Sequence, residues 1–183
     1  MRIISGKAKG TKLYTLDGLE TRPTLDRVKE SLFNIIQSRI EDALILDLFS
    51  GSGAIGLEFL SRGARKAYLC DKSKDAVDII RKNVQKTHME ENAEILNMDY
   101  KKALDKVKSE KFDIVYLDPP YKTDFIKESI EIILENNCLN KDGIIILETD
   151  EKDRVKKEIN KNELSIIDER KYGRANLMFL EKI

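Results

Sequence analysis

The chain has 183 residues, of which 41% are hydrophobic and 36% charged, and its 33 basic residues balance its 33 acidic residues. This length suits one globular domain with a substantial core, and zero net charge argues against a protein that coats naked nucleic acid. There is neither a leader pattern nor an apolar run of membrane-spanning length, so we expect a cytoplasmic protein. Cys70 and Cys138 lack metal-site or disulfide-framework spacing, which predicts two reduced thiols and no metal.

The first 40 residues are expected to form a short basic addition to the domain. Residues 2–5 and 11–15 are predicted to pair as a hairpin, and a helix is predicted from Thr24 to about residue 40. Residues 1–29 contain seven basic and three acidic residues. Such a region can contact phosphate groups through a limited footprint, although each of these basic residues alone is more often a solvated side chain.

A glycine-rich loop follows the first apolar run. Residues 43–49 are nearly all apolar, as in a parallel strand buried on both faces. Gly51, Gly53 and Gly56 then match G-x-G-x-x-G before a helical pattern. Because glycines permit a tight turn and a close approach of backbone amides, we predict a ligand at the N-terminus of this helix.

Acidic residues end four successive predicted strands: Asp47, Asp71, Asp99 and Asp118. Asp71 lies 20 positions after Gly51 and could accept hydrogen bonds from both ribose hydroxyls of an adenosine, while Asp99 could reach an adenine amine. Each acid alone is more often a solvated strand end. In open α/β sheets, however, ligands bind beyond the carboxyl ends of the strands, so the four together predict a ligand site.

The fourth strand, near 112–118, runs into the tetrad Asp118-Pro119-Pro120-Tyr121. Two consecutive prolines cannot continue a sheet ladder, because each lacks an N–H and fixes φ. A carboxylate, an unpaired proline carbonyl and an aromatic ring therefore meet at the end of one strand. These groups suit a flat base that carries an exocyclic amine, although the tetrad alone could also be an ordinary strand-ending turn.

The pattern alternates strands and helices along the rest of the chain. Strands are predicted near 43–49, 66–71, 93–98, 112–118, 144–148, 164–170 and 175–181. Helices are predicted near 54–62, 73–88, 100–108, 123–136 and 151–160. This order predicts an α/β fold with a doubly wound, mostly parallel seven-stranded sheet that ends in an antiparallel hairpin. Without repeats or linkers, residues 1–183 are expected to form a single domain, with 41–183 as its core.

These motifs together resemble a known enzyme class. Asp47-Leu48-Phe49-Ser50-Gly51-Ser52-Gly53 and the Asp-Pro-Pro-Tyr tetrad resemble motifs of class I S-adenosylmethionine-dependent methyltransferases, which have a Rossmann-like fold. Residues 1–13 and 21–34 are similar to the N-terminal part of bacterial small-subunit ribosomal RNA guanine-N2 methyltransferases. The similarity runs from Met1 to about Phe179.

The resemblance implies a reaction and a set of site residues. It implies S-adenosyl-L-methionine-dependent methylation of the exocyclic N2 amine of a guanine in 16S ribosomal RNA, by a monomer acting on the small ribosomal subunit or its assembly intermediate. The implied cofactor-binding residues are Asp47, Ser50, Gly51, Gly53, Asp71, Lys72, Asp99 and Tyr100. The implied catalytic residues are Asp118, Pro119, Pro120 and Tyr121. The candidates for contacts with RNA or a cofactor lid are Arg2, Lys7, Arg22, Thr24 and Arg27.

Three alternatives use some of the same residues. A nicotinamide-dependent oxidoreductase would share the glycine loop and Asp71, but it does not need the proline tetrad, and 183 residues leave little room for a substrate domain. A DNA adenine-N6 methyltransferase shares the tetrad, which does not distinguish guanine from adenine, but usually adds a target-recognition region. A non-catalytic ribosome-assembly protein could retain the fold alone.

Overall fold

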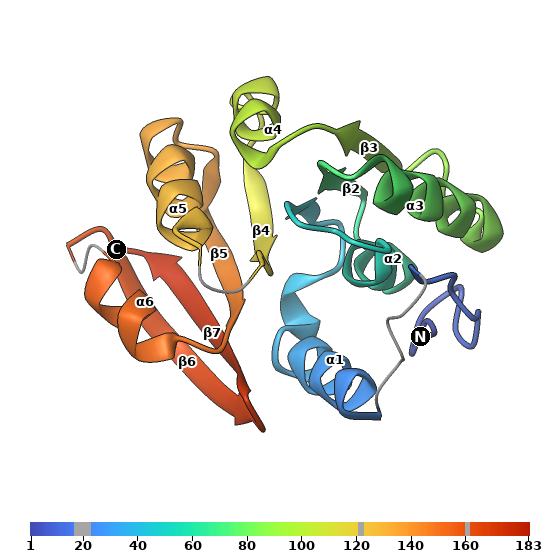
Figure 1. The fold of residues 1–183 in the computed structure, drawn as a ribbon, viewed down its shortest axis with the longest axis horizontal. Coiled ribbons are helices and arrows are strands. Elements are labelled where there is room, and N and C mark those ends of the chain that lie inside the picture. Colours follow the sequence, from blue (N-terminus) through green and yellow to red (C-terminus); the bar gives the residue numbers. More distant parts are fainter. Residues whose placement is uncertain (17–22, 121–122, 160–161) are drawn as a thin grey trace.

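The computed structural model describes residues 1–16, 23–120, 123–159 and 162–183, with the backbone alone for residues 23–26. Seven strands form one sheet in the order β3-β2-β1-β4-β5-β7-β6 (Figure 1). The strands are β1 Leu44–Asp47, β2 Lys66–Asp71, β3 Ala93–Asn97, β4 Phe112–Leu117, β5 Leu139–Thr149, β6 Leu164–Tyr172 and β7 Ala175–Lys182. Strands β1 to β5 are parallel, and β7 is antiparallel to both β5 and β6. The predicted doubly wound α/β sheet with a terminal hairpin is confirmed.

Helices cover both faces of the sheet. They are α1 Pro23–Ile35, α2 Ala54–Ser61, α3 Lys74–Thr87, α4 Tyr100–Lys106, α5 Phe125–Glu135 and α6 Lys152–Glu158. Buried side chains of α1, α2 and α3 form one hydrophobic cluster with the sheet, and those of α4, α5 and α6 form the other. The central strands are therefore buried on both sides, which explains their nearly continuous apolar sequences.

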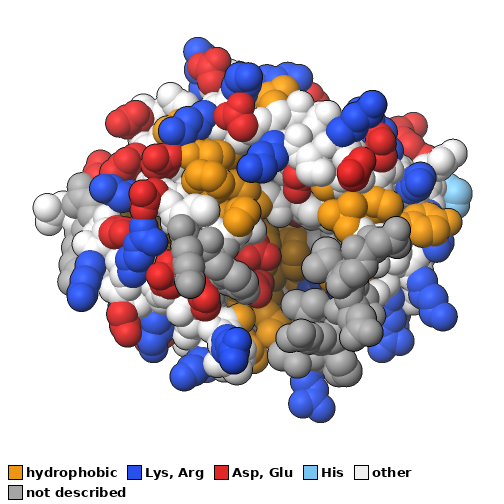
Figure 2. Space-filling model, viewed as in Figure 1, with side chains coloured by type: hydrophobic (Ala, Val, Ile, Leu, Met, Phe, Trp, Pro, Cys, Tyr) orange, Lys and Arg blue, Asp and Glu red, His pale blue; other side chains and the backbone are white. Residues whose placement is uncertain are grey.

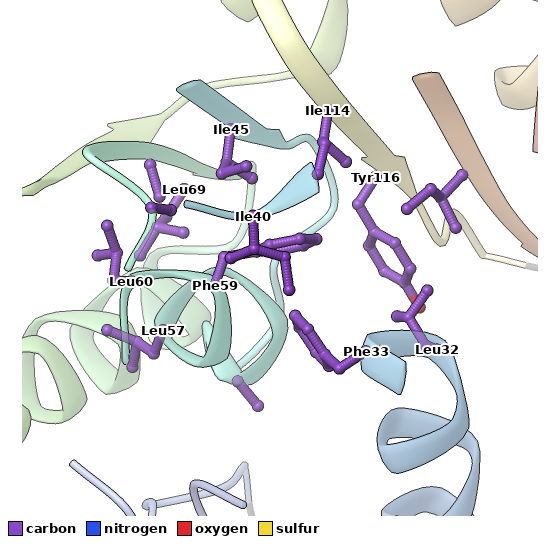
Figure 3. Close-up of a cluster of buried hydrophobic side chains, with 14 of the residues drawn as sticks. Leu32, Phe33, Ile40, Ile45, Leu57, Phe59, Leu60, Leu69, Ile114 and Tyr116 are labelled. Carbon is purple, nitrogen blue, oxygen red and sulfur yellow. The ribbon is translucent and has the colours of Figure 1, made fainter. Parts of the chain in front are cut away.

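Successive residues of a strand enter opposite clusters. In β4, Ile114 and Tyr116 belong to the α1–α3 side, whereas Val115 and Leu117 belong to the α4–α6 side. Figure 3 shows the first side, where Phe33 of α1 and Phe59 of α2 lie near Tyr116. The rings of Phe33 and Phe59 meet edge to face with centroids 4.6 Å apart. This alternation decides which side chains at the strand ends share a face.

The N-terminal segment forms a short version of the predicted hairpin and also binds to α2. An antiparallel bridge joins Arg2 and Lys12, and backbone hydrogen bonds flank it from Ile3 N to Thr11 O, from Gly10 N to Ile3 O and from Leu13 N to Met1 O, at 3.0, 2.9 and 3.0 Å. The fully buried carboxylate of Glu58 in α2 accepts hydrogen bonds from the backbone N–H groups of Ile4 and Ser5 at 2.8 and 3.0 Å. The hairpin is thus fixed to α2 by contacts distant in sequence, which local pattern could not predict.

The same carboxylate also pairs with two cations. Lys29 Nζ of α1 lies 3.1 Å from Glu58 Oε2, and Arg62 Nε donates to Glu58 Oε1 at 2.8 Å. Lys29 is itself buried, and its Nζ also donates to the backbone oxygen of Arg2. Glu58 therefore joins the N-terminal segment, α1 and α2 at one buried centre.

Predicted boundaries were wrong at both ends of α1 and at the start of β5. Helix α1 ends at Ile35 and a 3-10 turn, Gln37–Arg39, follows it, whereas the prediction continued to about residue 40. It begins at Pro23, so Thr24 lies inside the first turn and not before it; proline is favoured there because its missing N–H needs no partner. Strand β5 begins at Leu139, five residues before its predicted start, and a register shift against β4 accommodates the additional residues.

Both cysteines are reduced and fully buried. The Cys70 thiol of β2 donates to the backbone oxygen of Met98 at 3.4 Å, and burial raises its pKa to about 12. Cys138 directly precedes β5. Among the residues described, no helix has the length and apolar character needed to cross a membrane.

Candidate active site

The predicted glycine loop joins β1 to α2. It has free space at Gly51 and close packing against β2 at Gly56. Gly51 and Gly53 have φ values of +55° and +79°, which favour glycine, and α2 begins at the next residue. A Cβ on Gly51 would meet no atom within 4 Å. A Cβ on Gly56 would lie 2.0 Å from Leu69 Cδ2, because α2 packs closely on β2 there. The loop thus leaves space above Gly51 while α2 stays fixed to the sheet.

Asp47 ends β1 beneath this loop and is almost completely buried, with 1% of its surface exposed. Its Oδ2 accepts a hydrogen bond from Gly56 N at 3.1 Å, and Ser50 Oγ donates to its backbone oxygen at 3.0 Å. Its Oδ1 has no hydrogen-bond partner among the described residues. Burial, with a smaller contribution from the negative charge of Asp71, raises the pKa of Asp47 to about 7. A buried acceptor without a donor is unfavourable unless a water or a ligand supplies a hydrogen bond.

Asp71 ends β2 and holds the glycine loop. Its Oδ2 accepts from Gly51 N at 3.0 Å, and its Oδ1 accepts from Ser73 N at 2.8 Å. Each carboxylate oxygen has a second lone pair, so the side chain can still accept from ligand hydroxyls. Lys72, the next residue, is exposed.

Asp99 and Tyr100 lie at the start of α4 after β3. Asp99 caps the helix, and its Oδ1 accepts from the backbone N–H groups of Lys101 and Lys102 at 3.1 and 3.2 Å; chiefly because of the second bond, its pKa is lowered. Tyr100 is 8% exposed, and its hydroxyl donates to Glu128. Its ring centroid lies 4.8 Å from that of Phe125. The structure thus gives both residues a structural role, and their cofactor contacts stay predictions.

Three carboxylates lie on one face of three neighbouring strands, and we call them the acid cluster: Asp47, Asp118 and Glu148. The register pairs Asp47 of β1 with Tyr116 of β4, and Tyr116 with Ile146 of β5. Asp118 and Glu148 each follow this row by two residues, so alternation directs all three side chains toward the α1–α3 side. The parallel strands therefore bring the acids together at their carboxyl ends.

The electrostatics agree with this geometry. Burial first, and then the charges of Glu148 and Asp47, raise the pKa of Asp118 well above its usual range. Burial also raises the pKa of Glu148, whose Oε2 accepts a hydrogen bond from Tyr116 Oη at 2.7 Å. No lysine or arginine within the described ranges forms an ion pair with the acid cluster. Those ranges also contain no group of three or more potential metal ligands arranged to hold an ion.

The proline turn lies next to the acid cluster. Pro119 is buried and Pro120 is exposed, and the backbone oxygen of Pro120 accepts from Thr123 Oγ1 at 2.9 Å. Both prolines line a pocket together with Glu148. In Figure 1 the end of β4 lies near the middle of the view, and Figure 2 shows a hollow there that contains acidic and hydrophobic side chains. Tyr121 lies outside the described residues.

Sequence comparison places this arrangement in a family. The family described as "Conserved hypothetical protein 95" matches residues 1–181. The ribosomal RNA small subunit methyltransferase D of Haemophilus influenzae is 39% identical over 159 residues, which cover 84% of this chain and 80% of that protein. This chain belongs to the ribosomal RNA small subunit methyltransferase D family.

Two further relatives agree with the assignment. The protein of the same name from Escherichia coli K12 is 37% identical over 82% of this chain and 75% of its own length. The solved structure of Escherichia coli yhhF has a TM-score of 0.84 and 31% identity, and covers 100% of this chain and 97% of that one. The family fold thus extends over the whole length of this chain.

The predicted substrate residues of the N-terminal region lie on the surface or outside the described part. Arg2, Lys7 and Arg27 are exposed, although the backbone N–H of Lys7 donates to Ser61 O at 2.8 Å. Arg22 lies outside the described residues, as does the side chain of Thr24. Exposure of three basic side chains suits contact with a large partner, and their role remains a prediction.

The structure adds one residue to the predicted site. The sequence pattern identified four acids at four strand ends and treated residues 144–148 as an ordinary fifth strand. Glu148 follows the same rule as the other acids, because it lies near the carboxyl end of the fifth parallel strand. Its proximity to Asp118 depends on the β4–β5 register, which the sequence alone does not give.

Proposed function

We propose that this protein uses S-adenosyl-L-methionine to methylate the exocyclic N2 amine of a guanine in small-subunit ribosomal RNA. One observation carries the proposal: the Asp118-Pro119-Pro120 turn ends β4 beside the glycine loop and the incompletely hydrogen-bonded Asp47. The names of the relatives with 37% and 39% identity support ribosomal RNA as the substrate. The choice of guanine N2 comes from the resemblance of the sequence motifs.

The residues of the site fit the proposed cofactor. Open space above Gly51, the N-terminus of α2 and the unpaired Oδ1 of Asp47 offer a place for a polar group. Asp71 has lone pairs available for ribose hydroxyls. We assign cofactor binding to these residues together with Ser50, Gly53, Lys72, Asp99 and Tyr100. The cofactor would supply an electrophilic methyl group on a sulfonium cation.

The acid cluster suits a cationic ligand. Burial and mutual repulsion disfavour the ionised forms of Asp47 and Asp118, as their raised pKa values show. A positive charge bound nearby favours ionisation, and the low-dielectric surroundings strengthen that interaction. The acids would therefore be most fully ionised when a cation occupies the site.

Asp118 and Pro119 would then hold the target amine. The amine of a base is a poor nucleophile because its lone pair is delocalised into the ring. The Asp118 carboxylate and the Pro119 carbonyl would accept its two hydrogen bonds and orient the nitrogen toward the methyl group, while Tyr121 would stack on the base. Once methylated, the nitrogen is strongly acidic, and Asp118 with its raised pKa can take the proton.

The substrate is proposed to be the small ribosomal subunit or its assembly intermediate, in the cytoplasm, with the enzyme acting as a monomer. Seven basic residues among the first 29, including Arg2, Lys7, Arg22 and Arg27, would contact the RNA backbone or, with Thr24, order a lid over the cofactor. A guanine within a helix would have to leave the base stack before it could reach Asp118.

Methyl-labelled cofactor tests the proposal directly. The protein would be incubated separately with under-methylated small subunits, with their stripped RNA and with DNA, and the labelled nucleoside would be identified after digestion. We expect N2-methylguanosine from subunits or RNA. Label in N6-methyladenine, or in DNA alone, would overturn the ribosomal assignment and favour the DNA adenine alternative. No label despite cofactor binding would favour a non-catalytic assembly protein.

A further inference from the structure

Glu148 has a position that the proposed chemistry of Asp118 does not explain. It lies one strand away from Asp118, on the same face and in the same register row, because the preceding residues Leu117 and Leu147 are register partners. It also lines a small pocket of about 20 Å³ between the Pro119-Pro120 turn and α6. A second carboxylate beside the first is electrostatically unfavourable. A ligand group that donates a hydrogen bond to it would offset this repulsion.

Tyr116 fixes the orientation of this carboxylate. Its Oη donates to Glu148 Oε2 at 2.7 Å, and Tyr116 is 3% exposed and packed in the α1–α3 cluster. One oxygen of Glu148 is therefore held by a rigid donor. The other oxygen has lone pairs that can accept a hydrogen bond from a ligand N–H. The side chain is thus oriented before any base enters.

The amine-bearing bases differ at the ring atom next to the amine. In guanine, the N2 amine is adjacent to N1–H, which is a hydrogen-bond donor. In adenine and cytosine, the ring nitrogens beside the amine carry lone pairs and are acceptors. A carboxylate next to the amine site would therefore accept a hydrogen bond from guanine and repel the lone pair of the other two bases.

On the basis of the proposed function, we infer that Glu148 is the specificity-determining residue for guanine: it accepts the hydrogen bond from N1–H while Asp118 and Pro119 accept those of the amine. Glu148 and Asp118 then form two adjacent acceptors that match two adjacent donors. In this arrangement the Asp-Pro-Pro-Tyr tetrad binds an amine on a planar ring, and Glu148 selects guanine over adenine and cytosine.

A base analogue separates this role from general support of the site. The target guanine is first mapped with the wild-type protein, and the same RNA is then assembled by ligation with guanine or 2-aminopurine at that position. 2-Aminopurine keeps the N2 amine but has an acceptor at N1. The wild type should prefer guanine in kcat/KM by roughly 10²-fold or more, because a carboxylate faces a lone pair in the analogue. Glu148→Gln can donate a hydrogen bond to that lone pair, so its preference should fall at least about tenfold.

Control variants make the outcomes distinct. Glu158→Gln changes another acid that lines the same pocket but pairs with Arg154 at 2.8 Å, and its preference should equal that of the wild type. Tyr116→Phe leaves Glu148 in place without its donor and should reduce the preference by a smaller factor. An unchanged preference in Glu148→Gln, with guanine still methylated by the wild type, would overturn the inference alone. If the wild type forms no N2-methylguanosine, the proposed function fails, and the inference fails with it.

Discussion

Glu58 and the acid cluster have opposite surroundings, although both contain a fully buried carboxylate. Glu58 accepts hydrogen bonds from two backbone amides and pairs with Lys29 and Arg62, so its charge is fully compensated. In the acid cluster, Asp47 has an unpaired oxygen and no ion pair within the described ranges, and the pKa values of all three acids are raised.

The difference distinguishes an acid that stabilises the fold from acids that we propose to bind a ligand. A buried charge is tolerated when partners surround it, as at Glu58, where it joins three segments of the chain. Neighbouring acids that repel one another lower the stability of the free protein, and perturbed acids of this kind gather at functional sites. Substitutions in the two groups should therefore affect different measurements.

The largest effect is expected from Asp118→Ala. Removing the acceptor for the target amine should lower kcat/KM for methylation roughly 10³-fold, because orientation and charge stabilisation of the reacting nitrogen are both lost. Cofactor affinity, measured by calorimetry, should change little, and thermal stability should stay equal or rise because Asp118 no longer repels Asp47 and Glu148. A variant that still methylates at the wild-type rate would contradict the assignment.

Glu58→Ala should produce the largest loss of stability. It leaves Lys29 buried without this carboxylate and removes the acceptor for Ile4 and Ser5, so the free energy of unfolding in urea should fall by about 3–5 kcal/mol. Glu94→Ala is the matched control, because Glu94 pairs with Lys66 at 2.6 Å but both side chains are more than a third exposed. Its cost should stay below about 1 kcal/mol. Equal losses would show that the Glu58 centre has no special role.

Asp47→Asn should change the pH dependence of stability. The pKa of Asp47 is about 7 in the folded protein against an ordinary 3.8, so between these values the folded state holds a proton that the unfolded chain has lost. Wild-type stability therefore decreases as pH rises from about 4 to about 7, by up to about 1.4 kcal/mol per pH unit from this group. The variant lacks this contribution, and its stability relative to the wild type should rise over that range and level off above it. Urea titrations from about pH 5 to about pH 8 measure the difference, and parallel curves would contradict it.

Gly51→Ala should have a small effect on stability and a clear effect on cofactor binding. Its φ of +55° disfavours alanine by about 1 kcal/mol, but the new Cβ meets no protein atom within 4 Å. If that space receives the cofactor, affinity should fall about tenfold. Gly173→Ala has a similar φ of +60° and equally open surroundings in the β6–β7 turn, so it should lose stability without losing affinity. Equal affinities in the two variants would place the cofactor elsewhere.

The sheet was predictable because each central strand is a continuous apolar run that ends in glycine, proline or aspartate. The same signals placed Asp47, Asp71 and Asp118 at one edge. The attachment of the N-terminal hairpin to α2 was not predictable, since the partner of residues 4 and 5 is Glu58, more than 50 residues away. Glu148 was missed because its importance depends on β5 lying beside β4 in one particular register.

The two buried thiols allow local opening of the sheet to be measured by chemical labelling. Cys70 lies on β2 near the glycine loop and Cys138 lies at the start of β5, and neither is accessible in the closed fold. A thiol reagent can reach either one only during a transient opening, so the two labelling rates report the opening of two parts of the sheet separately. A ligand that bridges β1 and β2 should lower the labelling rate of Cys70 more than that of Cys138. The comparison would locate the ligand site without any substitution.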